Sequence, residues 1–503
     1  MQEIGTVIST LEGPSSSEFF FVIKDVKGIP IRKGQFVQLQ TEEGLLVARV
    51  SEIVKTNRYF MRAESVSEYE KSGKPLMDVF PVDRWEYLVA HATALGIYSD
   101  GTNKRVSFPP SPGQKVFGVD EKILFNFLGL DQEKGIEIGN VEFHNIETKL
   151  NLTKLFQKHC AILSQTGFGK SHLVSVLVEE VLERNKEFGM PAIIVADPHG
   201  EYVGFADDGK YSTRTKVFDR NSISIAAYKL SANQICEFQP FISSVERREL
   251  NSIIEKTRQQ KNAYDLNELI AEVEISEIKP VTKAPLVSWL SDLNSTDLFK
   301  KVDSPNVEQL AVSGQLSVLD LSEFIHLRDR QIIVANVARK LFAARRENKI
   351  PPFILVVEEA HQFAPEGEQK SEAISKNIIE TIAREGRKFN ACLVLVSQRP
   401  IQLSTTALSQ CNTSILLRIV NPYDIKHITE SCEGITSDIM EMLPGLRIGE
   451  AIIAGGAVNF PLLVQVKTRR TKSSDKLGMN LEDVSINYLA QKEKSKDDLD
   501  AFT

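Results

Sequence analysis

Short apolar runs, rich in β-branched and aromatic residues and separated by turn residues, fill residues 1 to about 85. Closely spaced strands and turns of this kind predict a small β-barrel. We expect Phe19, Phe20 and Phe21 to lie in its core and not to serve as a platform for stacked bases, because small barrels need large apolar side chains inside. The runs are Ile4–Ile8, Phe19–Ile23, Gln35–Leu39 and Leu45–Val50.

Residues 86–150 follow a less regular pattern. Pro109–Gly113 is a turn, because proline and glycine interrupt both helices and strands. The apolar spacing of Phe117–Leu128 fits a strand or a helix, and both remain open. We expect this region to connect the barrel to the domain that follows.

From residue 151 the pattern changes to continuous apolar strands that alternate with amphipathic helices. Strands without polar positions are buried on both faces, and alternation with helices is typical of a parallel sheet covered on both sides. The sequence therefore predicts an α/β domain over residues 151–466. Its strands are His159–Leu163, Ala192–Asp197, Leu316–Leu321, Phe353–Val357, Ala391–Val396 and Ser414–Val420.

Three stretches depart from this alternation. Residues from about 225 to 310 are helical without strand signals, which indicates a helical insertion. Glu450–Ala454 and Phe460–Val466 are close enough to pair as an antiparallel hairpin around Gly455 and Gly456. The tail, residues 467–503, begins basic and ends acidic and polar, and is either disordered or docked on a neighbouring subunit.

Composition narrows the class of protein. A chain of 503 residues predicts two or three domains, and a net charge of −7 gives no overall positive field for nucleic acid, so such binding requires a local patch or a pore. The 5 cysteines have no paired spacing, which argues against a zinc site or a disulfide framework and favours a reducing cytoplasm. No apolar run approaches the roughly 20 residues that span a bilayer, and Met1–Thr10 does not resemble a signal peptide. We expect a cytoplasmic protein without a membrane segment.

Ser164–Ser171 is a glycine-rich turn that ends in Gly-Lys-Ser, between a buried strand and a helical pattern. This is the context of a phosphate-binding loop, and we expect a RecA-like P-loop ATPase core that binds ATP. Lys170 would reach the β- and γ-phosphates, and the Ser171 hydroxyl would hold Mg²⁺. The alternative is a glycine-rich helix start without a ligand. The predicted nucleotide contacts are Gln165, Thr166, Gly167, Phe168, Gly169, Lys170, Ser171 and His172.

Two acids, Glu358 and Glu359, follow directly on the apolar strand Phe353–Val357. Acids at the carboxyl end of a parallel strand lie beside bound ligands. We assign Glu358 to Mg²⁺ and Glu359 to the activation of the attacking water. The alternative is a solvated pair of acids that ends the strand, and the presence of a P-loop in the same chain makes this alternative less favoured.

Polar side chains at the ends of other strands complete the predicted site. Gln398 follows the strand Ala391–Val396 and is a candidate sensor of the γ-phosphate, against the alternative of a simple turn. Asp197 and His199 border the site or a pore, or form a capped turn. Arg384 and Arg387, or else Arg418, are candidates to stabilise the transition state in a neighbouring subunit, against the alternative of surface salt bridges.

These motifs, in this order, resemble those of the HerA family, prokaryotic and mainly archaeal DNA helicase-translocases related to the FtsK pumps. The Asp-Pro-His-Gly-Glu-Tyr string is more specific than the P-loop. Two positions depart from the family pattern: Ser164 replaces the first glycine of the loop, and Glu358 replaces the more usual aspartate. The resemblance rests on Lys33–Val37, Pro109–Gly113, Ser164–His172, Asp197–Tyr202, Val357–His361, Ala383–Lys388 and Ser397–Pro400.

The resemblance implies a ring, expected to be a homo-hexamer, that encircles DNA and has ATP sites between subunits. It also implies a NurA-type nuclease as partner in the resection of DNA ends during recombinational repair. A ring would concentrate a small basic loop into a positive pore, which suits an acidic chain. Candidates for such a loop are Lys210, Arg214, Lys216, Lys370 and Lys376.

Two other functions compete with the DNA motor. One is a related ring ATPase that pumps protein or conjugative DNA through a membrane, and the absence of an apolar span counts against it. The other is a scaffold that binds ATP and hardly hydrolyses it. Glu359 and Gln398, in the order expected of a hydrolase, argue against the scaffold.

Overall fold

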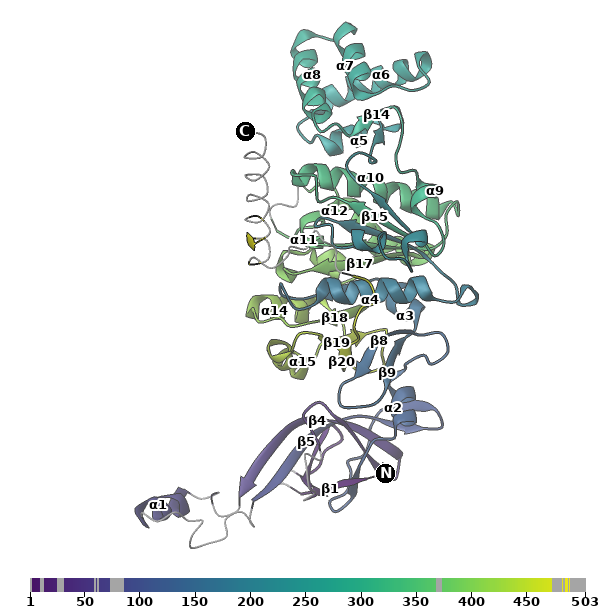
Figure 1. The fold of residues 1–503 in the computed structure, drawn as a ribbon. Coiled ribbons are helices and arrows are strands. Elements are labelled where there is room, and N and C mark those ends of the chain that lie inside the picture. The colour runs from purple at the N-terminus through teal and green to yellow at the C-terminus, as the bar shows by residue number, and fades with distance from the viewer. Residues whose placement is uncertain are drawn as a thin grey trace, which may run out of the picture. The chain divides into compact units, whose positions relative to one another are not determined.

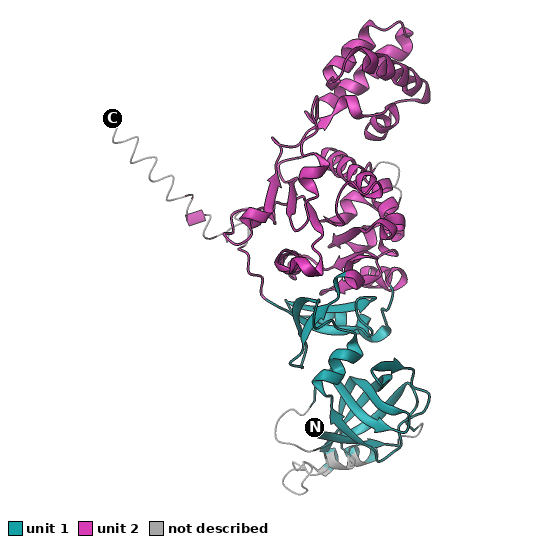
Figure 2. Ribbon diagram, turned by 90° about the vertical axis from the view of Figure 1, so that its right-hand side faces the viewer, with its two compact units in different colours: residues 1–152, 433–467 teal, residues 153–432, 468–503 magenta. Residues whose placement is uncertain are grey.

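A computed structural model of the chain describes residues 2–9, 13–24, 31–57, 60, 63–72, 86–367 and 373–472, together with 482, 485, 486 and 488. The chain divides into two compact units (Figure 2). Unit 1 comprises residues 1–152 and 433–467, and unit 2 comprises residues 153–432 and 468–503.

Unit 1 begins with a closed β-barrel. Its strands follow the order β2 (Glu18–Ile23), β1 (Glu3–Ile8), β7 (Lys115–Gly118), β3 (Phe36–Thr41), β4 (Gly44–Asn57) and β5 (Glu86–Ser99), and β5 pairs back with β2. The short β6 (Thr102–Lys104) extends β5, and α1 (Ala63–Ser72) lies between β4 and β5 in the chain. Since β5 and β7 are barrel strands, the barrel continues past residue 85 into the range assigned to a connector.

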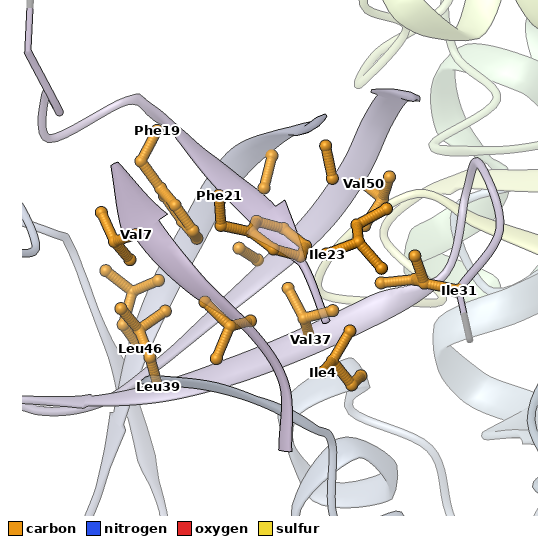
Figure 3. Packing of buried hydrophobic residues seen from close by; sticks show 14 of the residues in the cluster. Ile4, Val7, Phe19, Phe21, Ile23, Ile31, Val37, Leu39, Leu46 and Val50 are labelled. Carbon is orange, nitrogen blue, oxygen red and sulfur yellow. The ribbon is translucent and has the colours of Figure 1, made fainter. Parts of the chain in front are cut away.

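Buried apolar side chains form the core of the barrel (Figure 3). Phe19 and Phe21 are each 0% exposed within it, which confirms their expected place. Phe20, on the opposite face of the same strand, is only partly buried and stacks on His91 with ring centroids 4.6 Å apart. The alternation of β2 thus places two of the three phenylalanines inside.

The open alternatives for Phe117–Leu128 are both realised in part. Its first two residues end β7, and the helix α2 (Glu121–Leu128) follows. The Asp120 side chain accepts hydrogen bonds from the N–H groups of Lys122 and Ile123, and Gly129 ends the helix in a left-handed conformation with φ 75°.

The remaining strands of unit 1 are antiparallel, in the order β19 (Glu450–Gly455), β20 (Leu462–Val466), β8 (Ile136–Val141) and β9 (Glu147–Leu150). The predicted hairpin around Gly455 and Gly456 is confirmed, and α15 (Ser437–Met442) precedes it.

Unit 2 contains the predicted parallel sheet, in which the described neighbouring strands pair in parallel. The order is β12 (Thr215–Phe218), β15 (Leu316–Asp320), β11 (Ala192–Asp197), β16 (Phe353–Val357), β17 (Ala391–Ser397), β10 (Cys160–Leu163) and β18 (Thr413–Leu416). Except for β12, these strands are buried along their whole length, as their apolar sequences require. The α/β fold is therefore confirmed. Helices of this sheet region are α3 (Leu152–Phe156), which starts in unit 1, α4 (Lys170–Glu183), α9 (Val307–Leu310), α10 (Leu327–Arg346), α11 (Ala360–Phe363), α12 (Lys376–Glu385), α13 (Thr405–Leu408) and α14 (Pro422–Ser431).

A group of helices interrupts unit 2 between β12 and β15, where the insertion is predicted (Figure 1). Three of the helix starts carry a capping box, formed by Ser231 with Gln234, Ser243 with Glu246, and Asp265 with Glu268. The short strands β13 (Ile225–Ala226) and β14 (Phe299–Lys300) pair in parallel at the two ends of the group. Its helices are α5 (Ala232–Phe238), α6 (Ser244–Gln260), α7 (Leu266–Ile275) and α8 (Pro280–Asn294).

Within the described part of the chain, none of the helices combines the length and the apolar character needed to cross a bilayer.

Candidate active site

The glycine-rich loop joins the carboxyl end of β10 to the start of α4. Gly167 and Gly169 have φ values of 84° and 90°, in the left-handed region that side chains disfavour. Helix α4 begins at Lys170, and Gly169 before it has no side chain that could cap the helix. The N–H groups of the first turn therefore point into the space that the loop encloses. An uncapped helix start behind such a loop attracts a polyphosphate.

Ser164, which replaces the first glycine of the motif, is fully buried. Its backbone N–H donates to the carbonyl of Ser397 over 3.2 Å, and its hydroxyl donates to the carbonyl of Gln165 over 2.7 Å. The serine thus forms part of the seam between β10 and β17. The N–H group and the hydroxyl of Ser164 are thus both hydrogen-bonded to backbone carbonyls. Serine at this position therefore does not interfere with the side of the loop that would bind phosphate, where Gly167 and Gly169 lie.

Glu359 and Lys170 form a buried ion pair. Lys170 Nζ lies 2.9 Å from Oε1 of Glu359, whose residue is 3% exposed. Glu359 has φ 49° and ψ 45°, a left-handed conformation that is costly for a residue with a side chain and that recurs at functional sites. Its second oxygen, Oε2, is buried without a hydrogen bond of good geometry, 3.3 Å from Nδ1 of His361. One carboxylate oxygen is thus paired with Lys170, and the other has no hydrogen-bond partner among the described residues.

Glu358 faces a different partner. The hydroxyl of Tyr202 donates to its Oε1, and both residues are buried. Burial is the largest cause that raises the pKa of Glu358, to about 8, and the charge of Lys170 and the Tyr202 hydroxyl oppose this rise. The sequence analysis missed Tyr202 as a site residue. Its place at the end of the Asp-Pro-His-Gly-Glu-Tyr string was the available signal.

Asp197 organises the loop that carries Tyr202. It is fully buried, and its carboxylate accepts hydrogen bonds from the backbone N–H groups of His199, Gly200 and Tyr202. Burial raises its pKa to about 6. Asp197 is therefore the acid of a capped turn, as one of the two alternatives predicted, and the loop it shapes brings His199 to 4.0 Å from Glu359.

The residues assigned to Mg²⁺ are Ser171 and Glu358, one hydroxyl and one carboxyl group. No group of three or more His, Cys, Asp or Glu side chains that would hold a metal occurs among the described residues. Mg²⁺ in nucleotide sites takes one or two protein ligands and completes its shell with phosphate oxygens and water, so this donor set fits an ion that arrives with the nucleotide. When bound, such an ion neutralises charge on the phosphates.

Gln398 lies beside the P-loop, as expected of a sensor. The Thr166 hydroxyl donates to its Oε1. Parallel pairing of β10 with β17 brings the ends of the two strands together, with Leu163 opposite Ser397. The predicted sensor and the predicted phosphate loop are therefore in direct contact.

The candidate arginines separate into two groups. Arg384 and Arg387 are exposed at the end of α12 and in the turn before β17, which is the edge of the sheet opposite the P-loop. Arg384 lies 3.7 Å from Glu380. Arg418 instead follows β18 and places its guanidinium 4.9 Å from the ring centroid of Phe168 in the P-loop. Arg418 thus belongs to the loop of its own chain, and the other two arginines do not reach their own site.

His172 and the candidate pore residues have other surroundings. His172 is partly buried in the first turn of α4. Lys210 lies 2.5 Å from Glu183, and Arg214 donates to the carbonyl of Leu182, so both contact the end of α4 that is far from the P-loop. Lys376 is buried and donates to the carbonyl of Pro365, which makes it unsuitable as a free pore charge. Lys216 is exposed, and Lys370 lies outside the described residues.

The fold and the site together define a P-loop ATPase with a RecA-like core. Residues 136–341 match the family model described as "Helicase HerA, central domain". A probable helicase of Methanocaldococcus jannaschii is 28% identical, over 92% of this chain and 95% of its own. The DNA double-strand break repair helicase HerA of Sulfurisphaera tokodaii is 26% identical, over 98% of each chain. The solved structure of VirB4 from Thermoanaerobacter pseudethanolicus has a TM-score of 0.53 at 14% identity, over 68% of this chain and 98% of its own, and thus shares the fold.

These matches confirm the resemblance inferred from the motifs: the chain is similar to HerA helicases over most of its length, and it is an ATP-hydrolysing enzyme.

Proposed function

We propose that this protein is a ring-forming DNA helicase-translocase driven by ATP hydrolysis. The observation that carries the proposal is the pairing of Lys170 with Glu359 at the carboxyl edge of the sheet, with Gln398 in contact with the same loop. Those positions suit a cradle, a base and a sensor for the γ-phosphate.

Each of these residues has a distinct part in the proposed reaction. The loop amides from Gln165 to His172 hold the phosphates, while Lys170 leaves Glu359 and turns to the β- and γ-phosphates. Glu359 then orients the attacking water and accepts its proton, for which the buried and unbonded Oε2 is suited. Ser171 and Glu358 would hold Mg²⁺. Arg384 and Arg387, exposed and far from their own P-loop, are suited to a neighbour's site.

DNA is the proposed track because the similar protein of Sulfurisphaera tokodaii, with near-complete coverage, is named a DNA double-strand break repair helicase. We extend this to DNA end resection, with a homo-hexameric ring around duplex DNA and a NurA-type nuclease as partner. A cytoplasmic location is supported by the cysteines, which are free thiols, four of them buried. The alternative, a pump for protein or conjugative DNA, has the fold shared with VirB4 in its favour.

The ATPase rate of the purified full-length chain, with and without linear duplex DNA, tests the proposal. We expect Mg²⁺-dependent hydrolysis that DNA stimulates and that added salt suppresses, because phosphate contacts release counterions. Electron microscopy of the same samples should show rings. Stimulation by unfolded protein and not by DNA would favour the pump. Negligible turnover in every condition would favour the scaffold that binds ATP and hardly hydrolyses it.

A further inference from the structure

One side chain touches both the predicted catalytic acid and the strand that carries the predicted sensor, although no motif assigned it a role. His361 lies in α11, directly after the acid pair, and is 9% exposed. Its Nδ1 atom lies 3.3 Å from Oε2 of Glu359 and 3.1 Å from the hydroxyl oxygen of Ser397. Ser397 is the last residue of β17 and precedes Gln398.

Ser397 also fixes the turn that follows the strand. Its hydroxyl oxygen accepts the backbone N–H of Arg399 over 3.1 Å. A continuous series of contacts therefore runs from Glu359 through His361 and Ser397 to Arg399. Gln398, between Ser397 and Arg399 in the chain, is bound to the P-loop through Thr166.

The imidazole can make only one of these contacts as a donor through Nδ1. Burial lowers the pKa of His361, against the opposing effect of Glu359, and Arg399 and Lys170 lower it further. A neutral ring carries a single N–H, and with that proton on Nδ1 it can be directed at the carboxylate or at the hydroxyl, one at a time. A shift of Glu359 would therefore change which of the two oxygens the Nδ1–H group faces.

His361 is one of the residues that line a cleft of about 1230 Å³. Gln398 and Arg399 line this cleft from the sheet, while Phe241 and Trp289 line it from the helical insertion. His361 thus contacts the carboxylate of Glu359 and also borders a cavity large enough to admit part of another molecule. The series of contacts ends at residues that such a molecule would touch.

We infer that His361 is a positioning residue that holds Glu359 in place and couples it to the turn carrying Gln398 and Arg399. The inference rests on the proposed function, because it assigns a task within the same ATPase site. Its importance rises when nucleotide binds, since Lys170 then leaves Glu359 for the phosphates. His361 remains as the side chain that orients the acid.

Steady-state kinetics of His361→Ala and His361→Asn test the inference. The alanine variant should lower kcat by about 10-fold or more, while the Kd for a non-hydrolysable ATP analogue stays within about 3-fold, because orientation and not binding is lost. In His361→Asn, the side-chain amide replaces Nδ1 and should restore kcat to within about 5-fold of wild type. A purely structural role would not produce rescue by asparagine at unchanged affinity.

Ser397→Ala separates coupling from simple support. It should reduce the stimulation of kcat by DNA, and the double variant His361→Ala/Ser397→Ala should be no slower than His361→Ala alone, because both act through one series of contacts. If the alanine variant of His361 does not fold, His361→Phe, which keeps a ring and removes Nδ1, takes its place in the same cycle. Wild-type kcat in His361→Ala, or strictly additive losses in the double variant, would overturn the inference.

The wild-type control separates this result from the proposed function. Wild-type protein without DNA-stimulated turnover would overturn the proposed function itself. Normal wild-type turnover with an unaffected His361→Ala variant would overturn only the role of His361.

Discussion

Lys170 Nζ and Glu359 Oε1 lie 2.9 Å apart, so the two charges of the P-loop ATPase site neutralise each other before any phosphate enters. The pair is largely buried, with side chains 12% and 4% exposed. Nucleotide binding must therefore exchange one partner of Lys170 for another. The exchange also releases the acid that would activate water, which links substrate entry to the readiness of the base.

Replacing Glu359 by glutamine separates binding from hydrolysis. We expect ATP turnover to fall by a factor of about 10² to 10⁴, the usual contribution of a general base. Affinity for a non-hydrolysable analogue should be unchanged or tighter, because the neutral amide releases Lys170. Isothermal titration calorimetry and a phosphate-release assay measure the two quantities.

Lys170→Ala is the matched control, and it should weaken nucleotide binding itself. Glu359→Gln with wild-type hydrolysis would show that another group activates the water.

Tyr202→Phe tests the environment of Glu358. The hydroxyl of Tyr202 is a hydrogen-bond donor to this buried acid, and partners behind a metal ligand commonly alter metal affinity by about 10-fold or more. We expect the Mg²⁺ concentration for half-maximal ATPase activity to shift in this variant, with little loss of nucleotide binding.

The control is Tyr211→Phe, which removes a hydroxyl that donates to Glu183 at the far end of α4. Equal Mg²⁺ dependence in the two variants would mean that Tyr202 does not influence the metal.

The fold of unit 2 was predictable because its information is local. Continuous apolar runs such as Phe353–Val357 identify buried parallel strands, and Gly167 and Gly169 mark the turn that only glycine adopts easily. The acid pair and Gln398 followed from their places at strand ends. These are short-range patterns. Because the carboxyl ends of parallel strands lie at the same edge of the sheet, residues at those ends come close together in the fold.

Long-range pairing was not predictable in the same way. The barrel closes through β5, whose pairing with β2 joins residues 89–93 to residues 18–22. The spacing of residues within β2 or β5 does not identify the other strand as its partner. Tyr202 was missed for a related reason, since its partner Glu358 is distant in the sequence. The local pattern around an aromatic residue does not show that its hydroxyl group will meet a buried carboxyl group.

Arg384 and Arg387 provide a test of the ring. Since both lie at the edge of the sheet opposite their own P-loop, a catalytic role requires a neighbouring subunit. We expect Arg387→Ala homo-oligomers to hydrolyse ATP slowly, by a factor of about 10³ if the residue stabilises the transition state. Mixing them with Lys170→Ala subunits should restore part of the activity, because some interfaces then combine an intact loop with an intact arginine.

Arg384→Ala, mixed in the same way, shows which arginine acts. An unchanged rate in both arginine variants would limit these residues to surface contacts.

Glu179 holds the start of the C-terminal tail on the P-loop helix of its own chain. This carboxylate, fully buried in α4, accepts the backbone N–H groups of Arg470 and Thr471 and the Thr471 hydroxyl, over 2.6–3.0 Å. Residues 468–472 are therefore docked in cis, whereas most of the tail lies outside the described residues. Glu179→Ala leaves these donors without their acceptor and should lower the free energy of unfolding by about 3 kcal/mol.

Chemical denaturation measures this loss, and Glu180→Ala is the control. Glu180 lies 3.0 Å from the guanidinium of Arg470, whose side chain is 40% exposed and also pairs with Glu183, so removal of Glu180 should cost about 1 kcal/mol or less. A chain truncated after Lys467 should be destabilised like Glu179→Ala, and adding Glu179→Ala to it should have little further effect, because the donors are already absent. Equal stability of the Glu179 and Glu180 variants would mean that the tail contributes nothing to the helix that carries the P-loop.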